Sequence, residues 1–212
     1  MTYVLMMNIA DVTGEDYCRL YLKSDSYRRK KADRYLRQED RIRCIVAGAL
    51  LHLAVQKAVG HADYEIETSP FGKPMVKGAA DFHFNLSHSG QWVVIAYSSR
   101  PVGIDVEKIC WDSGKENLAR RYFTADEQDY VFGQGPQGCA ARFFEIWTAK
   151  EGYLKYIGTG LQKSLNSFSV LQLATPNRHS FLLDGEYSMS LWMEEEACDV
   201  EQLSASDLLK EN

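Results

Sequence analysis

The sequence predicts an α+β fold built as two similar halves, residues 1–101 and 102–212. Each half begins with a strand pattern, has a long amphipathic helix near its middle, and continues with strands separated by glycine-bearing turns. The halves meet near Pro101, and no residue-by-residue repeat is visible between them. With 212 residues, of which 45% are hydrophobic, the chain can bury one large core or two smaller ones.

Composition argues against several classes of protein. No run approaches the ~20 apolar residues needed to span a bilayer. Residues 1–10 are apolar but have no basic leader, so they predict a first strand rather than a targeting signal. The five cysteines contain no C-x-x-C pair, which favours free thiols and a cytoplasmic location over disulfides or a zinc cluster. The net charge of −5 argues against general nucleic-acid binding.

The N-terminal half is expected to begin with a strand and a helical region. Residues 14–23 predict a short helix, and Ser24-Asp25-Ser26 offers N-cap residues for the segment that follows. Residues 28–43 carry eight basic and three acidic side chains, a net +5 in a chain otherwise at −10. This segment is interpreted either as a solvated helix face or as a patch for a polyanionic small molecule. Residues 39–59 predict the first long helix, which Gly60 ends.

Three strands are predicted next, at residues 64–67, 81–86 and 91–98. Before the second of them, Pro70-Phe71-Gly72-Lys73-Pro74 predicts a rigid turn that holds one lysine at a fixed angle. The second and third strands form a hairpin, with Ser87-His88-Ser89-Gly90 as its turn. A turn histidine is most often only a polar loop residue. Alternatively, Ser87, His88 and exposed turn amides donate hydrogen bonds to a phosphate.

The central segment, residues 102–108, alternates in the manner of a half-buried strand. Asp105 and Glu107 then point to one face and the aliphatic residues to the other. Two carboxylates at i and i+2 on a strand lie ~6–7 Å apart, and that separation can hold one hard divalent cation. Solvent-facing strand ends also carry such acids, so this pair alone is weak support for a metal site.

The C-terminal half is expected to contain two helical regions. Residues 116–123 predict a helix, and Thr124 to Glu127 have the spacing of a capping box, which by itself explains Glu127. Residues 140–157 predict the second long helix, with Lys150 inside its apolar stripe, where an ammonium needs a partner. Glu151 and Lys155 lie on the flank of that stripe, where an i, i+4 surface pair would explain them.

The remaining features concern Gly152 and the end of the chain. A glycine inside a helix costs about 1 kcal/mol against alanine, so Gly152 favours a close approach by another element. Residues 181–183 and 187–193 predict a closing hairpin over Asp184-Gly185. The acidic residues beyond it predict a tail that frays.

Five motifs, in order along residues 28–170, resemble the 4′-phosphopantetheinyl transferase family. The two that match its signatures are Gly103-Ile104-Asp105-x-Glu107 and Trp147-Thr148-x-Lys150-Glu151-x-x-x-Lys155. The supporting motifs are Phe71-Gly72-Lys73-Pro74, Phe84-Asn85-Leu86-Ser87-His88-Ser89-Gly90 and Phe123-Thr124-Ala125-Asp126-Glu127. The chain is similar in length to the larger, surfactin-synthetase-activator type. It departs from the family at Gly152, where Ala or Ser is usual, and at Cys44, where a hydroxyl residue is common.

The resemblance implies a pseudo-dimeric monomer, with two α+β halves related by a pseudo-twofold axis and with coenzyme A and Mg²⁺ in the cleft between them. The implied reaction transfers 4′-phosphopantetheine from coenzyme A to a serine of an apo acyl or peptidyl carrier protein, and releases adenosine 3′,5′-bisphosphate. The implied metal ligands are Asp105, Glu107 and Glu151. The implied coenzyme A ligands are Arg28, Lys31, Arg43, Lys73, Ser87, His88, Lys150 and Lys155.

The resemblance also implies catalytic roles. Glu151 could act as general base for the serine, and Lys155 could stabilise the leaving oxygen. Glu127 stays open between base, outer-sphere ligand and helix cap. Two other functions also fit the residues: an Mg²⁺-dependent nucleotide phosphotransferase or phosphatase, and a non-catalytic module that binds a carrier-like helix.

Overall fold

The computed structural model describes residues 1–61 and 63–210 and has the predicted α+β class. Its first elements are β1 (Thr2–Asn8), η1 (Ile9–Asp11), α1 (Gly14–Lys23), α2 (Ser26–Asp33), α3 (Gln38–Val59), β2 (Ile66–Thr68), β3 (Pro74–Val76), β4 (His83–Ser89) and β5 (Trp92–Ser98). The elements that follow are β6 (Gly103–Lys108), α4 (Ser113–Tyr122), α5 (Ala125–Phe132), α6 (Cys139–Ile157), η2 (Gly160–Gln162), η3 (Leu165–Ser167), β7 (Asn177–Leu183), β8 (Tyr187–Met193), β9 (Cys198–Leu203) and α7 (Ala205–Lys210).

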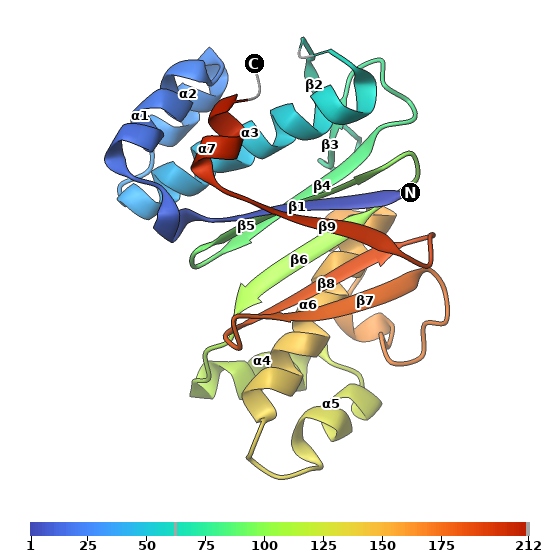
Figure 1. The fold of residues 1–212 in the computed structure, drawn as a ribbon. Coiled ribbons are helices and arrows are strands. Elements are labelled where there is room, and N and C mark those ends of the chain that lie inside the picture. The colour runs from blue at the N-terminus through green and yellow to red at the C-terminus, as the bar shows by residue number, and fades with distance from the viewer. Residues whose placement is uncertain (62, 211–212) are drawn as a thin grey trace.

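These elements form four layers, in the order helix, sheet, sheet, helix (Figure 1). The first sheet has the strand order β4-β5-β1-β9, and α1, α2, α3 and α7 lie above it in Figure 1. The second sheet has the order β6-β8-β7, and α4, α5 and α6 lie on its far side. The short β2–β3 pair stands apart from both sheets.

The strand period of two decides which side chains enter which core. Along β1, Leu5 and Met7 pack under α3, whereas Val4 and Met6 pack between the two sheets. The inner face of the second sheet supplies the other half of that central core, for example Ile104 of β6. A third core lies among α4, α5, α6 and the outer face of β8. The two sheets therefore pack face to face, and each is covered by helices on its other side.

The helix α3 carries the apolar stripe that the sequence predicts, and Gly60 ends it with a φ of 84°. Among the described residues, one helix, α3, has the length and apolar composition that would allow it to cross a membrane. Its apolar residues, such as Leu50 and Val55, are instead buried in the first core.

Two sequence predictions about strands need correction. The β4 strand continues to Ser89, so Ser87 and His88 are strand residues and not turn residues. The turn begins only at Gly90, which has a φ of 52°. The reason is the register with β5, in which Ser87 pairs with Val94 and His88 with Val93. The β2 strand also begins two residues later than predicted, at Ile66.

The end of the chain is the largest difference from the predicted fold. The tail was expected to fray, but Cys198–Leu203 forms β9, which pairs in parallel with β1. The helix α7 then packs into the first core through Leu208 and Leu209. The division near residue 101 thus separates β1–β5 from the second sheet, while residues 198–210 return to the first half.

Candidate active site

The two halves are joined by side chains of β4 that reach β6. Ser87 Oγ donates a hydrogen bond to Asp105 Oδ1 at 2.8 Å, and Ser89 Oγ donates one to Glu107 Oε2 at 2.7 Å. The side-chain oxygens of Asn85, Ser87 and Ser89 also accept hydrogen bonds from backbone N–H groups of β6, at 2.9 to 3.3 Å. Because side chains alternate along a strand, residues 85, 87 and 89 all face β6. This contact orients both carboxylates.

Two glycines allow α6 to pack closely on β6 and β8. A Cβ on Gly103 would lie 2.2 Å from the carbonyl oxygen of Gly152, and a Cβ on Gly152 would lie 3.1 Å from the Trp192 ring. The close approach expected from Gly152 is confirmed: Trp192 and the Ser190 carbonyl of β8 make it, while Gly103 lets the α6 backbone approach β6. The crossing brings Lys155, three residues beyond Gly152, over Asp105, two residues beyond Gly103.

Lys155 forms an ion pair with Asp105. Its Nζ lies 2.7 Å from Asp105 Oδ1, and it also donates to Ser87 Oγ and to the Ile104 carbonyl at 3.2 Å each. Asp105 is 4% exposed, and within residues 1–61 and 63–210 its Oδ2 atom has no hydrogen-bond partner. Asp105 therefore has one oxygen held by two donors and one buried oxygen left over.

Glu107 and Glu151 lie close enough to Asp105 for its charge to shift their pKa values. Burial raises the pKa of Glu107, and the Asp105 charge raises it further against the hydrogen bond from Ser89. Burial likewise raises the pKa of Glu151, followed by the charge of Asp105, while Lys155 opposes this shift. The predicted i, i+4 ion pair between Glu151 and Lys155 is replaced by the pair between Lys155 and Asp105.

The carboxylates suit a hard cation, but they do not form a complete set of metal ligands. In the part of the chain that the structure describes, no three His, Cys, Asp or Glu side chains converge as metal ligands. However, the free Oδ2 of Asp105 and the mutual repulsion of three acids are both relieved by a cation between them. Mg²⁺ commonly takes only one or two carboxylates and completes its shell with water and substrate phosphates. The donor chemistry therefore fits Mg²⁺.

Cationic groups flank the acids on the side of His88. Arg43 donates to the Gly90 carbonyl and pairs with Asp40 at 2.5 Å. Burial lowers the pKa of His88, and the charges of Arg43 and Lys155 lower it further. The His88 ring thus lies within electrostatic range of the Arg43 and Lys155 charges, and a group of cations of this kind suits an anionic ligand.

Three other predicted phosphate ligands lie outside this cluster. Lys73 Nζ donates to backbone carbonyls at the end of α6 and the start of β6. Arg28 lies on α2 against Gly48 of α3, and its Nε is buried without a partner among the described residues. Lys31 is exposed on the same helix.

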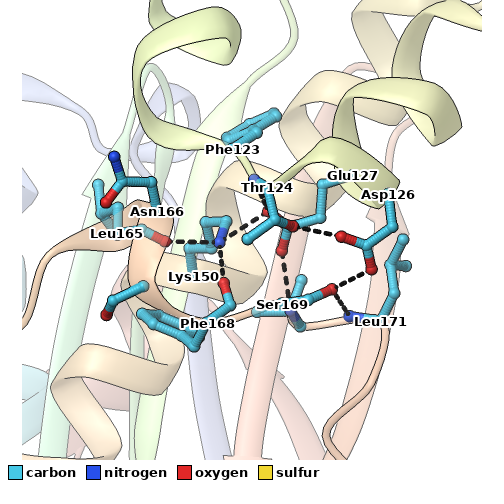
Figure 2. Close-up of polar contacts among 12 residues, drawn as sticks. Phe123, Thr124, Asp126, Glu127, Lys150, Leu165, Asn166, Phe168, Ser169 and Leu171 are labelled. Atoms are coloured by element: carbon cyan, nitrogen blue, oxygen red, sulfur yellow. Dashed lines mark hydrogen bonds and ion pairs between the residues drawn. The ribbon is translucent and has the colours of Figure 1, made fainter.

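Lys150, predicted to bind coenzyme A, lies in the protein interior (Figure 2). Its side chain and that of Glu127 are both fully buried, with Nζ 2.7 Å from Oε2. Nζ also donates to the Leu165 carbonyl at 2.7 Å and to the Phe168 carbonyl at 2.6 Å. An ammonium has three N–H donors, and all three are used here. Lys150 therefore has no donor left for a ligand.

Glu127, predicted between catalysis and capping, is the other member of this pair. Its Oε2 accepts from the Thr124 backbone N–H and its Oε1 from the Val170 backbone N–H, at 2.8 Å each. The capping interpretation is confirmed. The structure joins Glu127 to Lys150 and not to the acids of β6, so we revise its role to a structural one.

Sequence reasoning missed Asn85, Ser89 and Gly103 as site-building residues. A signal was present for the first two, because Asn85-x-Ser87-x-Ser89 places three polar side chains on one strand face. The prediction divided this pattern, with Asn85 in a strand and Ser87 and Ser89 in a turn. The part played by Gly103 depends on a contact with a residue 49 positions away and leaves no local trace.

Carboxylates paired with a lysine, with further cationic side chains nearby, form the kind of site found in the class of α+β proteins that transfer phosphate-linked groups. A family model described as the 4′-phosphopantetheinyl transferase superfamily matches residues 101–206. A second, described as 4′-phosphopantetheinyl transferase, N-terminal, matches residues 15–100. The chain belongs to the 4′-phosphopantetheinyl transferase superfamily.

Named relatives agree with this assignment. A 4′-phosphopantetheinyl transferase of Bacillus subtilis is 34% identical over 154 residues, which cover 72% of this chain and 68% of the relative. The 4′-phosphopantetheinyl transferase Sfp of Bacillus subtilis (strain 168) is 32% identical over 162 residues, covering 72% and 71%. The 4′-phosphopantetheinyl transferase psf-1 of Bacillus pumilus is 44% identical over 103 residues, covering 49% and 43%. These relatives place the chain with the larger, Sfp-type enzymes.

Proposed function

We propose that the protein transfers 4′-phosphopantetheine from coenzyme A to a serine of an apo carrier protein. The family and the names of the relatives give the activity. The observation that carries the proposal is the crossing of β6 and α6, where the two signature motifs meet and Lys155 lies 2.7 Å from Asp105.

In the proposed reaction the serine oxygen bonds to the phosphorus on the pantetheine side of the pyrophosphate. The bond from that phosphorus to the bridging oxygen breaks, and adenosine 3′,5′-bisphosphate leaves with the bond's electron pair. Glu151 of α6, which lies within reach of the Asp105 and Lys155 charges, is the proposed base for the serine proton. Lys155 is proposed to stabilise the negative charge on the leaving oxygen.

The acids are proposed to hold Mg²⁺ through Asp105, Glu107 and Glu151. The buried Oδ2 of Asp105, which has no hydrogen-bond partner among the described residues, supports this assignment. When bound, the ion supplies positive charge that offsets the negative charge of the pyrophosphate.

Coenzyme A is proposed to bind through the cations that flank these acids. His88, Arg43 and Ser87 are the proposed pyrophosphate ligands, because Ser87 contacts Asp105 and Lys155, and the charges of Lys155 and Arg43 both act on His88. Arg28 and Lys31 are proposed for the 3′-phosphate, supported by the basic charge of α2 and the unpartnered Nε of Arg28. We assign no ligand role to Lys150 or Glu127.

The decisive experiment incubates the protein with coenzyme A, Mg²⁺ and an apo carrier protein. The expected result is a gain of one phosphopantetheine in the carrier's mass. Release of free phosphate would favour a phosphatase or another phosphotransferase. An unchanged carrier mass together with carrier binding would favour a non-catalytic module. Carriers of fatty-acid, polyketide and peptide synthesis should be compared side by side.

We also propose that the enzyme acts as a cytoplasmic monomer whose halves are related by a pseudo-twofold axis. The five free cysteines support a reducing compartment. Each half places a long helix against its own sheet, α3 on the first and α6 on the second, which supports the symmetry.

A further inference from the structure

The Lys73 side chain crosses from the N-terminal half to the backbone of the C-terminal half. Its Nζ donates to the Lys155 carbonyl at 2.6 Å, to the Val102 carbonyl at 3.0 Å and, at the 3.5 Å limit, to the Tyr156 carbonyl. The three acceptors lie at the end of α6 and just before β6. One ammonium therefore links the two elements that carry Lys155 and Asp105.

The turn that presents Lys73 is stiff. The Ser69 N–H donates to the Lys73 carbonyl at 2.8 Å, and the Lys73 N–H donates to Ser69 Oγ at 3.1 Å. Gly72 has a φ of 84°, which suits glycine, and Pro70 and Pro74 restrict the backbone on either side. Because the turn already fixes the backbone of Lys73, little conformational entropy is lost when its amine binds the three carbonyls.

The end of α6 has acceptors that need such a donor. The last four carbonyls of a helix have no partner within it. The Gly158 N–H satisfies the Leu154 carbonyl at 3.0 Å. Lys73 reaches the next two, Lys155 and Tyr156. A cation is also favoured at this end of the helix dipole.

The same contacts leave Lys73 poorly placed as a phosphate ligand. An ammonium has three N–H donors, and three carbonyl oxygens lie within hydrogen-bonding reach of Nζ. Burial lowers the pKa of this ammonium from 10.5 to about 8. To bind a phosphate, the side chain would have to leave the end of α6.

We propose that Lys73 is a positioning residue, which fixes the end of α6 against the start of β6 so that Lys155 keeps its contact with Asp105. The proposal rests on the proposed function for its effect on catalysis. The physical link itself does not depend on any activity.

The test combines amide hydrogen exchange with kinetics in Lys73→Met, Lys73→Gln, Lys73→Arg and the control Lys77→Met. Lys77 follows the same turn, and its exposed amine pairs with Glu65 at 2.7 Å. In Lys73→Met, exchange at Gly158 and the last turn of α6 should speed up about tenfold or more, because the helix end loses its donor. Lys73→Arg should restore slow exchange, and Lys77→Met should match the wild type.

The kinetic arm separates positioning from phosphate binding. For Lys73→Met we expect kcat to fall about 10- to 100-fold, because Lys155 is displaced. The KM for coenzyme A should change little, and the preference for coenzyme A over 3′-dephospho-coenzyme A should stay as in the wild type. A lost preference, or unchanged exchange at Gly158, would overturn the proposal.

Two further measurements keep the test independent of folding and of the assigned activity. If Lys73→Met does not fold, Lys73→Gln keeps two N–H donors without charge and should show intermediate exchange. In the wild type, saturating coenzyme A should leave exchange at Gly158 slow; faster exchange would mean that the ligand withdraws Lys73 from the helix. A wild type that transfers no phosphopantetheine would refute the proposed function, while the exchange results would still decide the link.

Discussion

At the scale of single residues, the site depends on the unequal surroundings of the two Asp105 oxygens. Oδ1 accepts from Ser87 and Lys155, whereas Oδ2 is buried without a partner among the described residues. Leaving a buried acceptor unsatisfied costs about 1–3 kcal/mol. A protein retains such an atom where a ligand satisfies it, and this asymmetry leads to the first prediction.

Replacing Asp105 with alanine should abolish transfer and leave the fold intact. Rates should fall at least about 100-fold, because the proposed function makes Asp105 a ligand of the Mg²⁺ that offsets the pyrophosphate charge. Lys155 is 28% exposed, so its ammonium can turn to water when its partner is removed. Carrier-modification rates at ordinary Mg²⁺ and a thermal melt check both parts. Near-full activity would show that the metal assignment is wrong.

Glu151→Gln should lose turnover while its melting temperature stays level or rises. The raised pKa of Glu151 means that the folded protein disfavours its charge, through burial and then the repulsion of Asp105. Glutamine removes that cost, and loss of the base should reduce kcat about 100-fold or more. Melting without metal and single-turnover rates test the prediction. A lower melting temperature with normal turnover would return Glu151 to a structural role.

At the scale of elements, the buried pair of Lys150 and Glu127 joins α5, α6 and the segment around Leu165 and Phe168 (Figure 2). The sequence indicated that Lys150 needed a partner and that Glu127 capped a helix. It could not indicate that each was the other's partner, because 23 residues separate them and nothing local encodes the contact.

Lys150→Met should therefore be a stability variant. Removing one member of a buried ion pair costs about 3–5 kcal/mol, because the remaining charge has no partner. Urea unfolding should show this loss, while the folded enzyme keeps its KM for coenzyme A. The opposite pattern, a raised KM with normal stability, would restore the coenzyme A contact first predicted for Lys150.

Whether an element could be predicted depends on whether its contacts leave a local pattern in the sequence. Helices and strands with strong periodic patterns, such as α3 and β6, could be predicted because burial on one face leaves a periodic trace in the sequence. The β9 strand left little trace, because four of its six residues are exposed on a sheet edge. The site carboxylates could be named from the sequence, but their orientation by Ser87 and Ser89 depends on how the two sheets meet.

At the scale of the whole molecule, Lys73 gives the contact between the halves a dependence on pH. Its pKa is about 8 in the folded protein and near 10.5 when unfolded. Between these values the unfolded chain binds the proton more strongly, so the Lys73 contribution to stability rises with pH through this window and is lost as pH falls through 8. The difference in melting temperature between wild type and Lys73→Met should therefore widen from pH 8 to pH 10.

The control for this prediction concerns His83, which faces Lys73. Burial and the Lys73 charge hold the pKa of His83 below its ordinary 6.5, so it is already neutral throughout the window. The charges of Asp81 and Glu194 oppose that shift. A constant difference in melting temperature across pH 8 to 10 would contradict a buried ammonium at this position.

The return of β9 to the first sheet also has a consequence for how the chain is made. In the finished protein, β1 lies between β5 and β9. Along the chain, the β9 partner of β1 at Cys198–Leu203 follows β1 by almost two hundred residues, so the ribosome releases β1 long before β9. Until then one edge of β1, with its unpaired N–H and C=O groups, is open to pairing with other chains. The nascent chain therefore exposes an unpaired strand edge while the residues between β1 and β9 are made, and β9 covers that edge once it emerges.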